Sequence, residues 1–417
     1  MNYGLIAEHL GHSFSPEIHR QLFGYDYELK ELTPDELPGF MAARAFSAIN
    51  VTIPYKEAVL PYLDEISDIA RHIGAVNTVV NDGGRLVGYN TDFSGMQALI
   101  TRSGISLDGK KVLVLGSGGT SKTAVAVAKS LGCAAVWRVS RTGQEDCLTY
   151  EEAKEQHRDT HILINTTPCG MFPQLGVAAV NVTDYPALEG VVDAVYNPLR
   201  SRLVCDALAA GIPAVGGLYM LVAQAAFAAE KFIGRTAPPE KVEDIYRRLL
   251  AEKQNVVLIG MPGCGKSTVG KMLAQALNKD FVDADEEIVR RENRPIPDIF
   301  AEVGEAGFRD IEEQIIRSLS ARQNTVIATG GGAILRPENI RFLRENGRIY
   351  FIDRSLEQLV ATDDRPLSSD RVALEQRYRE RYAIYCDVCD RQVHSNNVIA
   401  DTVQTIREDF HDEIFGA

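Results

Sequence analysis

The sequence predicts an α/β protein with parallel sheets, in which one chain carries two nucleotide-binding units. Apolar, strand-like runs alternate with helical patterns along nearly all of the 417 residues. Two of these strands run directly into glycine-rich turns that open helices, within residues 112–132 and 256–277. No pattern recurs at a fixed period, so an array of structural repeats is excluded.

The composition is that of an ordinary globular protein, with 45% apolar and 24% charged residues. The net charge is −13 and both halves of the chain are acidic, so attraction to the phosphate backbone of a nucleic acid is not expected. No apolar run reaches the roughly 18 residues of a membrane-spanning helix, so no membrane partner is expected either. The N-terminus lacks a secretion signal and the seven cysteines are scattered, which favours a cytoplasmic protein.

The positions of the two turns predict the domain organisation. The first turn leaves a separate lobe in front of it, about residues 1–101. A nucleotide lobe follows over about 102–216, and an apolar helix is expected over 217–233. Pro239 suits the first position of a further helix within 217–250. A second unit then covers 251–417 after a short junction.

The second glycine-rich turn completes the phosphate-binding motif GxxxxGK[ST] between a strand and a helix. Backbone N–H groups of such a loop cradle phosphates at the N-terminus of a helix. We therefore expect ATP here, with the Lys266 amine at the β- and γ-phosphates and the Ser267 hydroxyl on Mg²⁺. The predicted nucleotide-binding residues are Gly263, Gly265, Lys266, Ser267 and Thr268.

Carboxylates and glycines follow this loop. Asp283 and Asp285 alternate at the end of an apolar strand, so we expect them to point the same way. Two carboxylates beside a phosphate loop suit one contact to Mg²⁺ and one to a hydroxyl group. Three consecutive glycines, residues 330–332, allow a ligand to lie against the backbone.

The ordered motifs GMPGCGKST, DxD, FRxIE, TGGG, RPL and RYxxxY resemble the shikimate kinase family over nearly all of residues 255–400. The resemblance implies a P-loop kinase fold with a parallel sheet. It implies that Asp283 holds Mg²⁺ through water, and that Asp285 contacts the shikimate hydroxyl and acts as the base. Lys266 would act on the transferred phosphate.

The same resemblance assigns three arginines and two glycines. Arg309 and Arg381 would clamp the carboxylate of shikimate, because a planar guanidinium suits a carboxylate. Arg377 and Arg379 are alternatives to Arg381, since the segment around it departs from the family pattern. Arg365 would be the lid arginine that closes on the phosphates. Gly331 and Gly332 complete the implied substrate site.

The first glycine-rich turn, with Gly116, Gly118 and Gly119, follows a strand and opens a helix, as a dinucleotide fold requires. The next strand ends near Ser140, where an NAD-binding fold places an acidic residue on the ribose. This chain instead has Arg141 and then Thr142. An arginine at this point suits the 2′-phosphate of NADP(H), so we expect NADP(H) rather than NAD.

Blocks on both sides of this turn, including HSFSP, NVTIPYK, NTD and NTTPCGM, resemble the shikimate dehydrogenase family over residues 1–245. The resemblance implies a two-lobed dehydrogenase with a Rossmann-type NADP lobe. It also implies that the first lobe, about 1–101, binds the substrate and that the helices within 217–250 return to it. In the reduction of a ketone, a hydride comes from the nicotinamide and a proton must reach the oxygen. Lys56 is the candidate proton donor, held in place by Asp92.

Further residues of this site are expected around the substrate. Ser13 and Ser15 are two hydroxyls at alternate positions that suit a carboxylate, although a turn or capping role beside Pro16 is the alternative. The resemblance adds residues that would hold the ring hydroxyls (Thr52, Asn77 and Gln224), the carboxylate (Tyr196) and the nicotinamide side (Gly217 and Met220).

Both resemblances imply the same small molecule. The chain is therefore expected to reduce 3-dehydroshikimate to shikimate with NADPH, and then to phosphorylate shikimate with ATP, in aromatic amino-acid biosynthesis. Its expected partners are these small-molecule substrates. A regulatory sensor that binds without turnover is an alternative, which the intact Lys56, Asp92 and Lys266 disfavour. Quinate with NAD in the first half is another, which Arg141 and the serine pair disfavour.

Overall fold

The computed structural model describes residues 1–11, 13–144, 146–359, 371–395 and 398–416. The chain divides into two compact units, each with its own hydrophobic core. The first unit comprises Met1–Met171, Val177–Asn197 and Leu203–Tyr246, and the second Phe172–Gly176, Pro198–Arg202 and Arg247–Ala417. Among the described helices, none combines the length and the hydropathy that crossing a bilayer requires.

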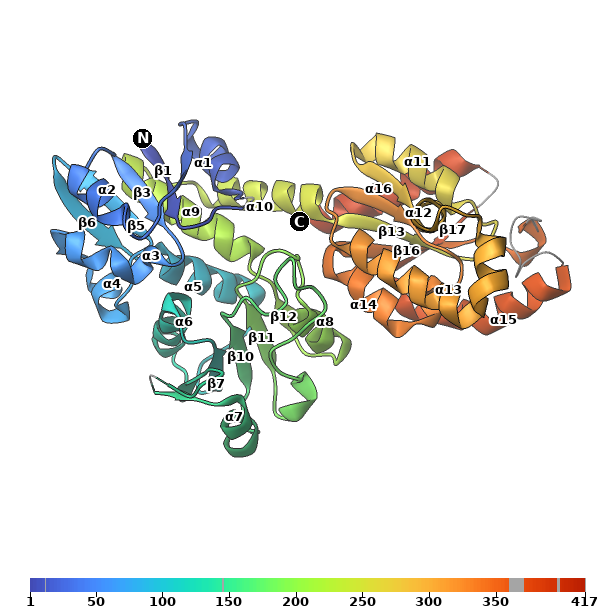
Figure 1. The fold of residues 1–417 in the computed structure, drawn as a ribbon, viewed down its shortest axis with the longest axis horizontal. Coiled ribbons are helices and arrows are strands. Elements are labelled where there is room, and N and C mark those ends of the chain that lie inside the picture. The colour runs from blue at the N-terminus through green and yellow to red at the C-terminus, as the bar shows by residue number, and fades with distance from the viewer. Residues whose placement is uncertain (12, 145, 360–370, 396–397, 417) are drawn as a thin grey trace. The chain divides into compact units, whose positions relative to one another are not determined.

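The first unit begins with a mixed sheet of order β2-β1-β3-β5-β6-β4. Its strands are β1 (Tyr3–Ala7), β2 (Glu28–Glu31), β3 (Ala48–Val51), β4 (Glu65–Ile66), β5 (Thr78–Asp82) and β6 (Arg85–Tyr89). Its helices are α1 (Ser15–Phe23), α2 (Leu37–Ala43), α3 (Tyr55–Ala58), α4 (Asp68–Ile73) and α5 (Thr91–Ser103), with a 3₁₀ turn η1 (Leu60–Tyr62). Figure 1 shows this sheet and its helices in blue.

This first sheet departs from the fully parallel arrangement that the sequence pattern predicts. Strand β5 runs antiparallel to both β3 and β6. Only Gly83 and Gly84 separate β5 from β6, and both have a positive φ, at 59° and 94°. Two such residues form the tight hairpin turn whose twist matches that of antiparallel strands. The glycine pair therefore folds this part of the chain back on itself.

The second sheet is fully parallel, with the order β12-β11-β10-β7-β8-β9. Its strands are β7 (Lys111–Leu115), β8 (Ala135–Val139), β9 (Cys147–Leu148), β10 (Ile162–Asn165), β11 (Gly190–Asp193) and β12 (Ala214–Val215). Taken in chain order, this is the 3-2-1-4-5-6 order of dinucleotide-binding folds, read from the other edge. The strand order reverses between β7 and β10, and the first glycine-rich turn follows β7 at that point. The predicted Rossmann-type sheet is confirmed.

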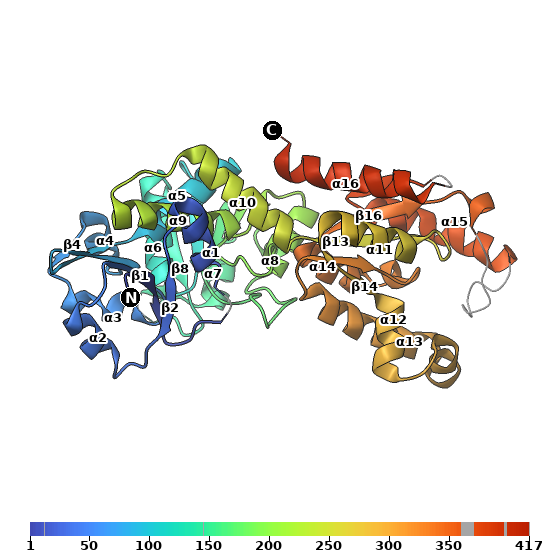
Figure 2. The ribbon, with the colours of Figure 1, turned by 90° about the horizontal axis from the view of Figure 1, so that it is seen from above.

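The helices of the second sheet include α6 (Gly119–Ser130), α7 (Tyr150–Gln156) and α8 (Arg202–Ala209), with a 3₁₀ turn η2 (Val182–Asp184). The apolar helix expected over 217–233 is α9 (Leu218–Ile233), which packs against α1 and α5 (Figure 2). Gly95 on α5 permits this, because a Cβ there would lie 2.7 Å from the Cβ of Gln224. Helix α10 (Pro239–Lys253) begins at Pro239, as predicted.

The second unit contains a parallel sheet of order β14-β15-β13-β16-β17. Its strands are β13 (Asn255–Ile259), β14 (Asp280–Asp283), β15 (Thr325–Ala328), β16 (Gly347–Asp353) and β17 (Arg391–His394). The second glycine-rich turn follows β13, the central strand. Helices α11 and α16 pack together on one face of the sheet, and α13 and α14 pack together on the other (Figure 2). The predicted P-loop fold is confirmed.

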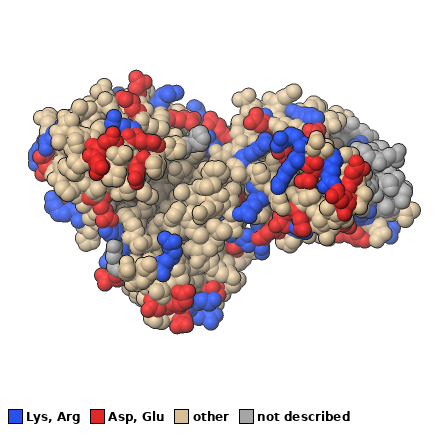
Figure 3. Space-filling view, in the orientation of Figure 1, with Lys and Arg blue, Asp and Glu red and all other residues tan. Residues whose placement is uncertain are grey.

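The helices of this unit are α11 (Lys266–Leu277), α12 (Ala284–Glu292), α13 (Ile296–Ser320), α14 (Pro337–Asn346), α15 (Arg371–Val388) and α16 (Ile399–Phe415), with 3₁₀ turns η3 (Ala333–Leu335) and η4 (Leu356–Gln358). Helix α13 is kinked at Gly304, whose φ of 67° is not helical. On the face in Figure 3, the Lys and Arg side chains of each unit lie among Asp and Glu side chains.

Candidate active sites

The first site contains an ion pair between a lysine and an aspartate. Lys56 lies on the single turn of α3, directly after β3, and Asp92 lies in the first turn of α5. The Lys56 Nζ is 2.6 Å from Asp92 Oδ2, and the two side chains are only 14% and 10% exposed. Asn90 caps α5 by accepting a hydrogen bond from the Phe93 N–H, which starts the helix at Thr91 and so places Asp92. The pairing predicted for Lys56 and Asp92 is present.

The structure also shows how the residues predicted to hold the ring hydroxyls are themselves held. The Asn77 Oδ1 accepts hydrogen bonds from both the backbone N–H and the hydroxyl of Thr91, at 2.7 and 3.2 Å. Asn77 is thus fixed beside the residue that precedes Asp92. The Thr52 backbone N–H bonds to Ile6, which holds the loop that leads to Lys56. Gln224 on α9 is half-buried and donates to the Leu221 carbonyl at 3.0 Å.

The segment at the start of α1 meets the loop after β11. The Ser13 hydroxyl accepts a hydrogen bond from the Ser15 N–H at 3.3 Å, which shapes the turn, and as a donor the same hydroxyl can still bind a carboxylate. The ring of Phe14, between the two serines, packs edge-on against Tyr196 with centroids 5.8 Å apart. Burial raises the pKa of Tyr196, so its phenol stays a neutral hydrogen-bonding group at physiological pH.

The first glycine-rich turn lies against the ion pair. A Cβ on Gly119 would lie 3.8 Å from both Cβ and Cδ of Lys56. Gly116 has a φ of 123°, and a Cβ there would meet the Thr166 hydroxyl at 2.6 Å. Gly118 precedes α6 without a side-chain cap, and a Cβ there would meet nothing within 4 Å. This open helix N-terminus suits the pyrophosphate of a dinucleotide.

Two other predicted cofactor positions have different environments. Gly217 precedes α9, and a Cβ there would lie 2.3 Å from the Ala194 carbonyl oxygen, so only glycine fits. Met220, in the first turn of α9, is buried. After β8, the buried Ser140 accepts from the Gly143 N–H at 3.1 Å, which shapes the turn, while Arg141 and Thr142 are exposed. An exposed guanidinium at this strand end can reach a ribose phosphate.

The second site begins at the phosphate loop. Gly260, Gly263 and Gly265 all have a positive φ, which curls the backbone around the N-terminus of α11. The Lys266 amine is buried and donates to the carbonyls of Gly260 and Met261, at 2.8 and 3.0 Å. These bonds hold the lysine against its own loop.

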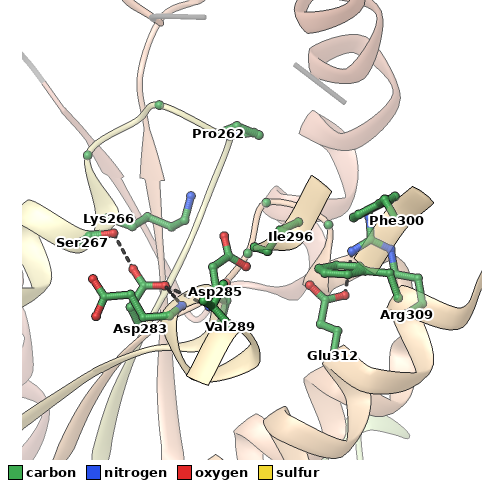
Figure 4. Close-up of a pocket in the computed structure, with 18 of the residues that line it drawn as sticks. Pro262, Lys266, Ser267, Asp283, Asp285, Val289, Ile296, Phe300, Arg309 and Glu312 are labelled. Carbon is green, nitrogen blue, oxygen red and sulfur yellow. Dashed lines mark hydrogen bonds and ion pairs between the residues drawn. The ribbon is translucent and has the colours of Figure 1, made fainter. Parts of the chain in front are cut away.

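Two oxygen donors converge beside this loop. The Ser267 hydroxyl donates to Asp283 Oδ2 at 2.5 Å, as Figure 4 shows. Hydroxyl and carboxylate oxygens are ligands that Mg²⁺ accepts, with water at its other positions. The donor set therefore fits the Mg²⁺ ion that the sequence implied.

The expectation that Asp283 and Asp285 alternate on one strand is wrong. Strand β14 ends at Asp283, whose Oδ1 accepts from the N–H groups of Asp285 and Glu286. A carboxylate in this position caps a helix, so α12 begins directly after it and carries Asp285 in its first turn. Figure 4 shows Asp285 between Asp283 and Glu312.

The glycine run lets charged side chains approach the backbone. A Cβ on Gly330 would lie 2.7 Å from Asp285 Oδ1 and 2.9 Å from Glu312 Oε1. A Cβ on Gly332 would lie 2.1 Å from the Arg309 guanidinium. Arg309 is buried and donates to Glu312 Oε2 at 2.7 Å (Figure 4). The run therefore leaves space that these side chains fill.

Arg381 closes the other side of the same region. It is buried on α15 and donates to the Gly331 carbonyl at 3.1 Å, beside the hydroxyl of the buried Tyr385, which donates to the same oxygen at 2.5 Å. Arg379 is exposed on the same helix. Of the arginines that compete for this role, Arg381 is the one that lines the cavity. Arg365 lies outside the described residues.

A cavity of about 580 Å³ joins these groups. Its lining contains every predicted residue of the second site that the structure describes. These are Gly263, Gly265, Lys266, Ser267, Thr268, Asp283, Asp285, Arg309, Gly331, Gly332 and Arg381. Apolar side chains of α12 and α13 complete the wall, at Val289, Ile296, Phe300 and Phe308. The site therefore combines a phosphate loop, two buried arginines and an apolar wall in one cavity.

Comparisons with known proteins agree with this geometry. Residues 5–79 match the family model described as the shikimate dehydrogenase substrate binding domain, and residues 262–411 match the shikimate kinase model. The NADP(+) shikimate dehydrogenase of Clostridium perfringens is 34% identical over 265 residues, which cover 59% of this chain and 97% of that protein. The chain belongs to the shikimate dehydrogenase family.

Solved structures of this dehydrogenase family are similar to the first part of the chain. A chorismate mutase/shikimate 5-dehydrogenase fusion from Clostridium acetobutylicum has a TM-score of 0.56 at 32% identity, covering 59% of this chain and 96% of its own. The Thermus thermophilus shikimate 5-dehydrogenase, in complex with NADP(H) and shikimate, has a TM-score of 0.54 at 32% identity, covering 60% and 99%.

The dehydrogenase part and the kinase part each contain a residue whose role the sequence left unassigned. In the kinase part it is Glu312, the acidic residue of the FRxIE motif, one helical turn after Arg309. Burial raises the pKa of Glu312, and the Arg309 guanidinium opposes that effect. In the dehydrogenase part it is Asn90, whose capping of α5 places Asp92. Its position in the NTD block was the signal that could have identified it.

Proposed function

We propose that the chain is a bifunctional shikimate-pathway enzyme. The first unit reduces 3-dehydroshikimate to shikimate with NADPH, and the second phosphorylates shikimate to shikimate 3-phosphate with ATP and Mg²⁺. One observation carries the proposal: the two family models that match this single chain are both named for shikimate. The reactions are consecutive, since the product of the first is the substrate of the second. We place the enzyme in the cytoplasm.

In the dehydrogenase reaction, bound NADPH supplies the hydride. Lys56 donates a proton to the developing alkoxide, and the ion pair with Asp92 at 2.6 Å holds the amine in position. Gly119 against Lys56 brings the pyrophosphate end of the cofactor site next to this donor. The remaining roles concern binding, with Ser13, Ser15 and Tyr196 at the carboxylate and Thr52, Asn77 and Gln224 at the ring hydroxyls.

In the kinase reaction, Ser267 and Asp283 would hold a Mg²⁺ ion, directly or through water, and the ion would supply neutralisation of the charge on the transferred phosphate. Asp285 accepts the proton of the attacking hydroxyl, and Arg309 and Arg381 hold the carboxylate of shikimate at the far end of the cavity. When ATP binds, the Lys266 amine gives up its hydrogen bonds to two loop carbonyls and donates to phosphate oxygens instead.

The domain limits and the cofactor preference belong to the same proposal. We assign the dehydrogenase to residues 1–250, with a substrate lobe of about 1–101 and 217–250 and an NADP lobe of about 102–216. The kinase takes 251–417. Arg141 holds the 2′-phosphate, with Ser140 and Thr142 beside it, so NADPH is the cofactor rather than NADH.

The experiment that tests the whole proposal combines the full chain with 3-dehydroshikimate, NADPH, ATP and Mg²⁺, and identifies the product. Shikimate 3-phosphate is expected. Shikimate that accumulates without phosphate would exclude the kinase half, and unoxidised NADPH would exclude the dehydrogenase half. Binding of shikimate with no turnover would identify a sensor. Faster oxidation of quinate with NAD than of shikimate with NADP would identify the other alternative.

A further inference from the structure

A second ion pair lies next to the catalytic one and joins different parts of the first unit. Glu57 directly follows Lys56 on α3, beside the first sheet. Its Oε1 lies 2.8 Å from the Nζ of Lys122, which is the fourth residue of α6, the helix that the dinucleotide turn opens. The pair therefore links the substrate lobe to the helix at whose N-terminus the cofactor phosphates bind.

A buried contact supports the same junction. The Asn90 side-chain amide donates to the Ala75 carbonyl at 3.0 Å and to the Thr123 hydroxyl on α6 at 3.3 Å. Lys122 and Thr123 are consecutive, so α6 is attached to the substrate lobe at two neighbouring points. Between these points and the turn, Gly119 lies against Lys56. The first turn of α6 is thus held in register with the proton donor.

We propose that Lys122 is a positioning residue of the dehydrogenase reaction, acting through Glu57. The pair holds the one-turn helix α3 against α6, which keeps Lys56 next to the site of the nicotinamide cofactor. This inference rests on the proposed dehydrogenase function. Lys122 acts through Glu57 and not by contact with the substrate.

The two partners have opposite electrostatic effects on the cofactor. Glu57 carries a negative charge near an anion-binding helix N-terminus, and Lys122 compensates it. Loss of the Lys122 charge leaves the Glu57 carboxylate to repel the phosphates, so the KM for NADPH should rise. Loss of the Glu57 charge leaves Lys122 to attract them, so that KM should not rise. Both losses release α3, so both should lower kcat.

The first unit contains a matched control pair. The Lys110 Nζ lies 2.6 Å from Glu189 Oε2, and their side chains are 29% and 50% exposed. The values for Lys122 and Glu57 are 30% and 48%. Lys110 and Glu189 precede strands β7 and β11, at the end of the second sheet away from the glycine turn. This control pair has the same residue types as Lys122 and Glu57 and a similar exposure, but it lies away from the glycine-rich turn.

The test measures kcat and the KM for NADPH in the full chain, with 3-dehydroshikimate as substrate. Because partly exposed pairs are weak, we expect Lys122→Gln to lower kcat about 2- to 5-fold and to raise that KM about 3-fold. Glu57→Gln should lower kcat similarly without raising the KM. Lys122→Arg keeps the positive charge and should retain wild-type kcat. This result would show that the effect of Lys122→Gln comes from loss of the charge and not from misfolding. Lys110→Gln should change neither parameter.

A double variant completes the cycle. If the pair acts as one unit, the double variant with Glu57→Gln and Lys122→Gln should have a kcat no lower than that of the less active single variant. Multiplied losses in the double variant would overturn the proposal, and so would a kcat for Lys122→Gln equal to that of Lys110→Gln. An inactive wild-type chain would instead refute the proposed dehydrogenase function, so the two failures are distinguishable.

Discussion

The two glycine-rich turns of this chain occupy equivalent positions but present different groups to a ligand. Each follows a central parallel strand, β7 or β13, and opens a helix, α6 or α11. The first turn presents backbone alone, since Gly118 leaves the helix N-terminus without a side-chain cap. The second adds a lysine and a serine to a loop with three glycines of positive φ. Because the first turn supplies no charged side chain, the proton donor of that site has to come from another segment of the chain.

That difference decides how each site is built. The dehydrogenase donor Lys56 follows β3 of the first sheet, and Gly119 follows β7 of the second. In the kinase site, Asp283 ends β14 and Gly330 follows β15, and both strands belong to the sheet that carries the phosphate loop. The first site therefore depends on contacts between two sheets. The second site depends on the alignment of neighbouring strands within one sheet. The variants below test this contrast.

The largest effect is expected from Lys56→Ala. Loss of a general acid typically lowers turnover by about 10²–10⁴-fold, so reduction of 3-dehydroshikimate should fall by this factor. Phosphorylation of shikimate by the same preparation should be unchanged, because the kinase site uses no residue of the first sheet. Steady-state rates of both reactions check this. A change of less than threefold in the reduction would remove Lys56 from its role.

Arg141→Asp should separate the two cofactors. It removes the partner of the 2′-phosphate and adds repulsion, so the binding free energy of NADPH should weaken by about 1.5–3 kcal/mol. NADH lacks that phosphate and serves as the internal control, so its KM should not rise. The KM values of both cofactors are the measurement. Equal use of NADH and NADPH by the unmodified chain would contradict the assignment.

A pair of glycine variants compares the turns directly. Gly332→Ala places a Cβ 2.1 Å from the Arg309 guanidinium, so the second unit should lose about 1–3 kcal/mol of stability or bind shikimate more weakly. Gly118→Ala meets no protein atom within 4 Å and should change stability by less than about 0.5 kcal/mol. It should nevertheless raise the KM for NADPH.

Thermal unfolding and the two KM values report on these variants together. The expected result is that one glycine is required by the protein and the other by the ligand. If both variants lose stability equally, the contrast between a packed site and an open helix N-terminus does not hold.

The smallest effect concerns acid stability, which should differ between the units. Burial lowers the pKa of His19 from 6.5 to about 3, so the unfolded chain binds one more proton than the folded chain between these values. The first unit should therefore lose stability as the pH falls below 6.5, by up to about 1.4 kcal/mol per pH unit. In the second unit, the described histidines His394 and His411 are exposed.

Trp137 provides the measurement, because it is the only tryptophan of the chain and lies in β8 of the first unit. Urea unfolding followed by its fluorescence should show a shallower pH dependence in His19→Phe, which retains a ring for stacking on Tyr27. The same slope in both proteins between pH 6.5 and 5 would show that other groups cause the acid sensitivity.

Much of the site chemistry could be read from short stretches of sequence. The phosphate loop, the dinucleotide turn and the start of α10 at Pro239 were all predictable, because each depends on neighbouring residues and on local backbone geometry. The same holds for the Lys56 and Asp92 pairing, which rested on the family blocks that contain them. The structure places both glycine-rich turns between a strand and a helix and begins α10 at Pro239, as expected, and it pairs Lys56 with Asp92.

Other features became evident only in the structure. Asp285 lies on a helix because β14 ends at Asp283, two residues earlier than the apolar pattern indicated, and the Asp283 side chain caps α12. The partnership of Glu57 and Lys122 joins residues 65 positions apart, and no local pattern marks it. Local motifs specify which groups are available, since they depend on the allowed backbone conformations of a few residues. The packing of sheets and helices determines which of those groups meet, because that choice depends on contacts between distant segments.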